Sequence, residues 1–164
     1  MKKTKNLSAH WRGFTLTELL LYMGLTVIFL GVLTDIFVTT LDVKKESEAT
    51  SAVEIDGRFI LSRLMYDVNH ADGVTAPAAL GESSTILTLD LDGVSDTFSF
   101  TNDNLTLNGA KLNSSESKIS AGSFQKLGNV DGKASVQIKF TVTSVTQRPK
   151  GPELRDYQIT LSTR

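Results

Sequence analysis

Cysteine is absent from the chain of 164 residues, and histidine occurs only as His10 and His70. The absence of cysteine excludes disulfide bonds, a thiol nucleophile, a zinc–thiolate site and a lipidated N-terminal cysteine. A serine–histidine–aspartate arrangement is not expected, because His10 lies in a basic N-terminal segment and His70 stands alone. No phosphate-binding glycine motif is present either. We therefore expect a protein that is not an enzyme, with no cofactor and no metal site.

Net charge is also small, because 17 lysine and arginine residues nearly balance 18 aspartate and glutamate residues. The basic residues are concentrated at one end. Residues 1–13 carry four of them and no acidic residue, which leaves 17 − 4 = 13 basic against 18 acidic residues in the remainder (Lys2, Lys3, Lys5 and Arg12). The basic residues near the C-terminus are not interleaved with aromatic side chains, so the sequence gives no sign of nucleic-acid binding.

A long apolar run follows the basic segment. Residues 14–34 contain one charged side chain, Glu18. As a helix these 21 residues would measure roughly 31 Å, which is the thickness of the hydrocarbon core of a bilayer. The positive-inside rule places residues 1–13 in the cytoplasm and the rest of the chain outside. A cleaved secretory signal peptide fits less well, because the run is too long and no small-residue cleavage site follows it.

The residues at the start of this run resemble a known motif. Arg12-Gly13-Phe14-Thr15-Leu16-Thr17-Glu18-Leu19-Leu20 is similar to the cleavage and methylation motif of type IV pilins and type II secretion pseudopilins. The resemblance implies that a prepilin peptidase cuts between Gly13 and Phe14, that Phe14 is then N-methylated, and that Glu18 acts in filament assembly. It also implies an inner-membrane location before assembly, and partners that include other pilin subunits and an inner-membrane assembly platform. Thr17 departs from the family pattern, which usually has an aliphatic residue before the glutamate.

The chemistry of Glu18 leaves two interpretations open. Cleavage would create a positive amine at Phe14, and an intramembrane carboxylate such as Glu18 is costly without a positive partner. Glu18 is expected to pair with that amine, either in the same helix or on a neighbouring subunit. Alternatively, Glu18 is a boundary residue whose carboxylate reaches the lipid headgroups.

Beyond the apolar run, small and apolar residues continue at helical spacing and predict an amphipathic stem over residues 42–73 (Ala49, Ala52, Val53, Ile60, Leu64, Val68 and Ala71). We expect one helix from about Phe14 to about Asp72, with Gly73 as its C-terminal stop. The charged residues between the apolar positions are expected on the exposed face, where Arg63 and Asp67 form an i, i+4 pair. The stem's end also resembles minor pilins, which favours a minor subunit.

From residue 74 onward the apolar period changes from 3.6 to 2 and predicts antiparallel strands over residues 87–91, 97–101, 105–107, 136–143 and 157–162. Turns are expected at Asn102-Asp103, Asn108-Gly109 and Asp131-Gly132, and a longer connection at 148–152. Because one face of such a sheet needs a cover, the stem should pack on it. The predicted fold class is α+β, with a long N-terminal helix on an antiparallel β-sheet in a pilin-like ladle.

The predicted organisation is a basic leader over 1–13, a transmembrane or filament-core helix over 14–41, a stem over 42–73 and a β domain over 74–164. The predicted function is a minor pilin or pseudopilin in a type IV pilus, a competence pseudopilus or a type II secretion pseudopilus. The alternative is a permanently anchored extracytoplasmic binding domain. Several aspartates near the predicted turns raise the question of a calcium site, but their spacing lacks the regular pattern of an EF-hand loop (Asp90, Asp92, Asp96 and Asp103).

Overall fold

A computed structural model describes residues 13–128 and 133–163 of the chain. The predicted leader, apart from Gly13, and the predicted turn at Asp131-Gly132 lie outside the described residues. The chain divides into two compact units, Met1–Leu41 and Asp42–Arg164.

One long helix, α1 (Leu16–His70), runs without interruption through 55 residues. The expected long apolar N-terminal helix is thereby confirmed, and its ends lie within two residues of the expected ones. The expectation that Gly73 caps its C-terminus is wrong. Gly73 has no left-handed φ and instead begins the first strand, where it is paired with Asp90.

All strands lie in the second unit and pair antiparallel, which confirms the α+β layout. The structure places nine of them in the described residues: β1 (Gly73–Ala76), β2 (Ser83–Ser84), β3 (Ile86–Leu91), β4 (Val94–Thr101), β5 (Asn104–Leu107), β6 (Ala110–Lys111), β7 (Ser117–Leu127), β8 (Ser135–Ser144) and β9 (Leu154–Ser162).

The expectation of a single sheet is wrong, because the strands form two. One sheet has the order β1-β3-β4-β5-β6 and the other the order β2-β7-β8-β9. The five predicted strands correspond to β3, β4, β5, β8 and β9. The longest strand, β7, was not predicted, and neither were the short strands β1, β2 and β6.

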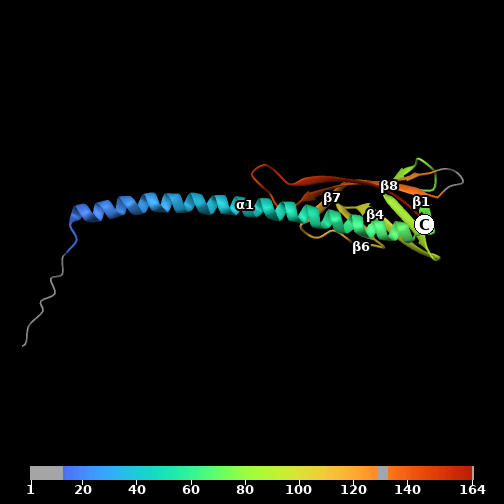
Figure 1. The fold of residues 1–164 in the computed structure, drawn as a ribbon, viewed down its shortest axis with the longest axis horizontal. Coiled ribbons are helices and arrows are strands. Elements are labelled where there is room, and N and C mark those ends of the chain that lie inside the picture. The colour runs from blue at the N-terminus through green and yellow to red at the C-terminus, as the bar shows by residue number, and fades with distance from the viewer. Residues whose placement is uncertain (1–12, 129–132, 164) are drawn as a thin grey trace, which may run out of the picture. The chain divides into compact units, whose positions relative to one another are not determined.

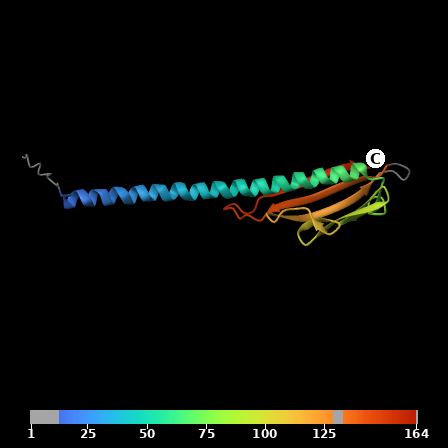
Figure 2. The ribbon, with the colours of Figure 1, turned by 90° about the horizontal axis from the view of Figure 1, so that it is seen from below.

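The core of the second unit lies between the C-terminal half of α1 and the two sheets. In both views this part of the helix lies along the strands (Figure 1), and Figure 2 shows it covering one side of them. The core includes Ile60 and Leu64 from α1, Phe98 from β4, and Phe124 and Phe140 from β7 and β8. Six of the seven predicted stem residues are buried, and the seventh, Ala52, is half-buried. The helical spacing therefore predicted the packed face of the stem correctly.

Two acidic residues of α1 correct the expectation that the charged residues of the stem lie on its exposed face. Asp56 and Asp67 are buried, with relative exposures of 7% and 1%. Asp67 does form the predicted pair with Arg63, at 2.7 Å between Nε and Oδ2. The pair is therefore partly buried rather than a surface pair.

Two predicted turns are present and have the backbone that a tight hairpin requires. Asn102 and Asp103 join β4 to β5 with φ of 51° and 61°, and Asn108 and Gly109 join β5 to β6 with φ of 51° and 84°. Positive φ at both central residues matches the twist of the flanking strands and favours asparagine and glycine at these positions.

Candidate functional site

The first unit contains the residues to which the motif points. Gly13, Phe14 and Thr15 are not helical, and α1 begins at Leu16. Thr15 caps the helix: its Oγ1 accepts a hydrogen bond from the backbone N–H of Glu18 at 3.2 Å, and its carbonyl accepts one from Leu19 at 3.1 Å. A threonine followed three residues later by a glutamate is a signature of a helix N-terminus, so Thr15 and Glu18 could have predicted the start of α1 at Leu16.

The peptide bond between Gly13 and Phe14 therefore lies outside the helix. Gly13 is exposed, and apart from its chain neighbours no described atom lies within 4 Å of where its Cβ would be. The Phe14 side chain is 71% exposed. A peptidase needs access to an extended backbone, and this bond can be cut without breaking a hydrogen bond of α1. Cleavage there would leave Phe14 as a single residue ahead of the Thr15 cap.

Glu18 lies in the first turn of α1 and is exposed. A carboxylate in the first turn is stabilised by the positive end of the helix dipole, typically by about 0.3–1 kcal/mol. Among residues 13–128 and 133–163 the Glu18 carboxylate forms no ion pair.

The helix behind Glu18 is apolar on every side. All residues of α1 from Leu16 to Leu41 are exposed, including large side chains such as Leu20, Phe29 and Phe37. This helix is long and apolar enough to cross a membrane. Four threonine hydroxyls in it donate hydrogen bonds to the carbonyl four residues earlier, which satisfies them without water (Thr26, Thr34, Thr39 and Thr40).

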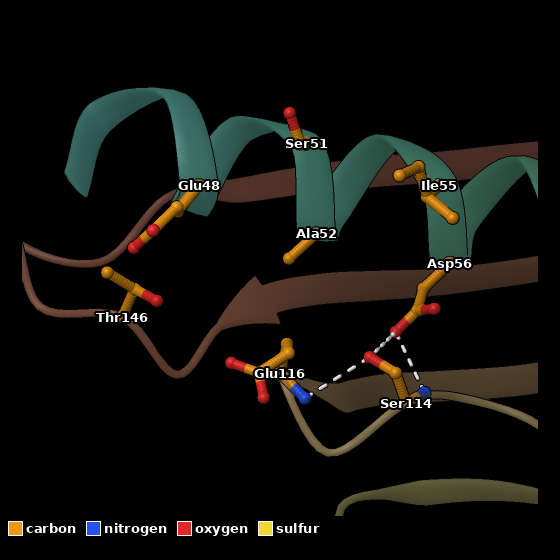
Figure 3. A pocket seen from close by; sticks show the side chains of 8 residues that line it. All are labelled: Glu48, Ser51, Ala52, Ile55, Asp56, Ser114, Glu116 and Thr146. Atoms are coloured by element: carbon orange, nitrogen blue, oxygen red, sulfur yellow. Dashed lines mark hydrogen bonds between the residues drawn. The ribbon is translucent and has the colours of Figure 1, made fainter. Parts of the chain in front are cut away.

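A second candidate site, which the sequence did not predict, is a groove of about 540 Å³ in the unit Asp42–Arg164. Figure 3 shows its wall on α1, formed by Glu48, Ser51, Ala52, Ile55 and Asp56. The opposite wall carries Ser114 and Glu116 from the segment before β7, and Thr146 from the connection between β8 and β9 (Figure 3).

Asp56 fixes one wall of this groove. Its Oδ2 accepts hydrogen bonds from the Ser114 backbone N–H at 2.9 Å, from the Ser114 hydroxyl at 2.7 Å and from the Ser117 hydroxyl. Ser114 and Ser117 lie 58 and 61 positions from Asp56 along the chain, so no local sequence pattern predicts these hydrogen bonds. Both hydroxyls donate to the Asp56 carboxylate, so the arrangement joins a loop to the helix.

Arg148 holds the connection that carries Thr146 against α1. Its side chain is only 9% exposed and pairs with Glu46 of α1 at 2.6 Å and with Glu153 at 2.7 Å. Its Nε also donates to the carbonyl of Gly151 at 3.0 Å. The predicted connection at 148–152 is exposed at Pro149, Lys150 and Pro152, and the mostly buried Arg148 guanidinium holds it against α1.

The aspartates near the turns serve those turns. The Asp90 carboxylate accepts a hydrogen bond from the Gly93 N–H, and the Asp96 carboxylate accepts one from the Asn108 amide at 2.8 Å. Asp103 pairs with Lys118 at 3.5 Å. Over residues 13–128 and 133–163, no three histidine, cysteine, aspartate or glutamate side chains come together as metal ligands.

His70 lies at the last residue of α1, as a helix-end residue. Its ring stacks on that of Tyr66 with a centroid separation of 4.2 Å, and its Nδ1 lies 2.7 Å from the Tyr66 carbonyl. These contacts are local to one turn of helix. No serine or cysteine shares a hydrogen bond with this imidazole in the part of the chain that the structure covers.

The motif residues and the exposed apolar helix thus lie in one unit, and the groove lies in the other. The chain matches no protein-family model, no curated protein and no solved structure.

Proposed function

We propose that this chain is a structural subunit, a minor pilin or pseudopilin, of a type IV pilus, a competence pseudopilus or a type II secretion pseudopilus. The observation that carries the proposal is the start of the first unit. An exposed, non-helical Gly13–Thr15 segment leads into a helix that exposes its apolar side chains on every side from Leu16 to Leu41, with Glu18 in its first turn. Such a helix needs lipid or other helices around it.

The proposed sequence of events begins in the inner membrane, where the helix spans the bilayer with its N-terminus in the cytoplasm. A prepilin peptidase hydrolyses the bond between Gly13 and Phe14, and the new amine of Phe14 is N-methylated. The methylated amine keeps its positive charge. Glu18 then pairs with such an amine as the helix moves from lipid into a bundle of helices.

Pairing at Glu18 gives assembly a selection step. Leaving one member of a buried ion pair without its partner costs about 3–5 kcal/mol. A subunit without the glutamate would therefore leave an unpaired amine inside the bundle. The outer unit, in a pilin-like arrangement, would lie on the outside of the filament or at its tip.

Replacement of the Glu18 carboxylate tests this proposal. Glu18→Gln should leave cleavage at Gly13-Phe14 intact, because the scissile bond lies before the helix, but should lower incorporation into filaments by at least about tenfold, as loss of a buried pair predicts. Asp35→Asn is a matched control, since it removes the other acidic residue from the apolar part of α1. Normal incorporation of Glu18→Gln would contradict the pairing role.

A permanently anchored binding domain is the second candidate, and the groove lined by Glu48, Ile55 and Glu116 is the observation that favours it. This candidate needs no processing at Gly13. It predicts that the chain isolated from native membranes still begins at Met1 or Lys2. The two candidates are therefore separated by the mass of the native chain.

A further inference from the structure

Strand β9 forms one edge of the four-stranded sheet, with β8 on its other side. We propose that β9 is a docking edge, to which an extended segment of another polypeptide adds as a further strand. The inference goes beyond the proposed function, because a filament subunit held only by its N-terminal helix needs no such edge. Three features support it: the direction of the β9 backbone groups, the state of the other sheet edges, and the side chains along the strand.

The direction of each β9 backbone group follows from its pairing with β8. The N–H of Thr163 donates to the Ala134 carbonyl at 3.0 Å, and the N–H of Ser144 donates to the Glu153 carbonyl at 2.7 Å. The register between the strands is unbroken from Ser162 to Leu154. In an antiparallel pair alternate residues face the partner, so the odd-numbered residues from 153 to 163 direct their backbone groups toward β8.

The even-numbered residues of β9 therefore direct their N–H and C=O groups away from the sheet (Leu154, Asp156, Gln158, Thr160 and Ser162). Five residues with two groups each present ten hydrogen-bonding groups along this edge. No backbone hydrogen bond to these groups exists within residues 13–128 and 133–163. The strand is one of the outermost in the ribbon, drawn in dark red (Figure 1). A row of this kind is a template for strand addition.

The other three sheet edges in the described part of the chain are blunted. Strands β2 and β6 have only two residues each, and the part of β7 that β2 leaves uncovered is broken by the register shift between Ser120 and Ser123. Strand β1 has four residues, carries a register shift between Val74 and Ala76, and is followed directly by Pro77. Short length, bulges and proline are the usual means by which proteins protect a free edge. β9 has nine residues, no register shift and no proline.

The side chains of β9 specify an amphipathic partner strand. Tyr157 and Ile159 on the inner face pack against the core but remain only half-buried. Asp156, Gln158 and Thr160 on the outer face are exposed. An added strand would continue both faces, so it should alternate apolar residues beside Tyr157 and Ile159 with polar residues beside the outer row.

A second copy of this chain fits the edge less well than a different polypeptide. In this chain Glu54 pairs with Arg155 and Tyr157 packs over Gly57, so β9 runs in the same direction as α1. Antiparallel pairing of two β9 strands would turn the two α1 helices in opposite directions. The proposed function requires every copy to leave one membrane in the same direction; this exclusion of a second copy rests on that proposal.

Amide hydrogen exchange tests the docking edge and does not require the partner to be identified. The full chain purified as a monomer in detergent is compared with the same chain in native membranes or filaments, with residue-level readout. The amides of Asp156, Gln158 and Thr160 should exchange at least about tenfold more slowly in the native assembly. The amides of Tyr157 and Ile159, already bonded to β8, are the internal control. Equal exchange of the outward amides in both samples would overturn the proposal, as would protection already present in the monomer.

A proline variant isolates the backbone contribution. Thr160→Pro removes an outward N–H without removing a bond to β8, and Thr160→Val keeps that N–H at the same position. Thr160→Pro should lose the slowed exchange in the assembly, and Thr160→Val should retain it. The wild-type comparison stands by itself if the proline variant does not fold. Protection that depends on a cross-linkable second copy would overturn the assignment to a different polypeptide.

The two proposals fail separately. A chain that begins with methylated Phe14 but has unprotected β9 amides in its filaments would contradict the docking edge alone. A chain that keeps its leader but has protected β9 amides in native membranes would contradict the proposed function alone.

Discussion

Among single residues, Gly57 shows that a glycine within the apolar pattern of a helix can be required by the packing of a neighbouring side chain. It is buried on α1 at a position where the stem pattern would otherwise have an apolar side chain. A Cβ at this position would overlap the ring of Tyr157. The Tyr157 hydroxyl donates to the Val53 carbonyl at 3.1 Å, and its ring stacks on Phe140. Burial raises the pKa of Tyr157, so the hydroxyl stays protonated and able to donate.

Gly57→Ala should therefore destabilise the unit Asp42–Arg164 by about 1–3 kcal/mol, because an added methyl forces the Tyr157 ring out of a packed position. Alanine is a better helix former than glycine by about 1 kcal/mol, so a net loss would show that crowding dominates. Gly73→Ala is the control, since apart from its chain neighbours no described atom lies within 4 Å of where its Cβ would be. Urea unfolding of the full chain in detergent measures both; a more stable Gly57→Ala would contradict the packing described here.

Asp67 is a second residue whose environment the sequence did not reveal. Burial raises the pKa of its carboxyl above the ordinary value of 3.8, and the charge of Asp96 raises it further. The hydrogen bond and charge of Arg63, and the charge of His70, lower that pKa and only partly offset burial. The folded state therefore holds the Asp67 proton more tightly than the unfolded state does.

The sign of the pH dependence follows from this pKa. Between 3.8 and the higher folded value the native chain binds more protons than the unfolded chain, so the contribution of Asp67 to stability falls as pH rises. Asp67→Asn should remove this decline, so the difference in free energy of unfolding between this variant and the wild type should shift in favour of the variant as pH rises from 3.8 through the raised folded pKa. Glu116→Gln, at an exposed carboxylate, controls for the lost charge. Parallel profiles for wild type and Asp67→Asn would contradict the assignment.

The sequence could not have indicated that Asp56 and Asp67 are buried. Helical periodicity assigns a face to each residue from its neighbours along the chain, and charged residues are expected on the wet face. The groups that donate hydrogen bonds to the buried Asp56 carboxylate belong to Ser114 and Ser117, which are distant from it in the sequence. Only the folded chain brings them together.

At the scale of elements, strands with regular alternation were predictable and the interrupted strand was not. In β8, Val136, Ile138 and Phe140 alternate without a break and are buried. In β7, buried Ile119 and Phe124 are five positions apart, because the register with β8 shifts between Ser120 and Ser123. A bulge reverses which residues face the core, so β7 does not show a period of two.

Ala121 in this bulge has a φ of 50°, which is uncommon for a residue other than glycine. Next to it, a Cβ on Gly122 would overlap the ring of Phe100. The bulge thus leaves room for an aromatic side chain of the other sheet. This contact joins the two sheets, and no local pattern predicts it.

The start of α1 is an element whose stability rests on one side chain. Thr15→Ala removes the Oγ1 that accepts from the Glu18 N–H and should destabilise the first turn by about 1 kcal/mol. The amide of Glu18 should then exchange about fivefold faster in the detergent-solubilised chain, whereas Thr15→Ser should keep the wild-type rate. Unchanged exchange in Thr15→Ala would show that Thr15 does not cap the helix.

At the scale of the whole molecule, the chain joins two units with opposite solvent requirements. The unit Asp42–Arg164 buries its apolar residues in a core of its own, whereas α1 up to Leu41 exposes them. The sequence predicted this contrast because a run of uncharged residues and a change of period are both local signals. The sequence did not predict that the strands form two sheets or that β9 has a free edge, because both features depend on pairing between segments distant in the sequence.

The proposed account depends on one event, the removal of the leader before Phe14. The most direct measurement is the intact mass of the chain isolated from native membranes of cells with an active prepilin peptidase. The account predicts a species that begins at Phe14 and carries one additional methyl group. A chain that retains Met1 or Lys2 in those cells would contradict it.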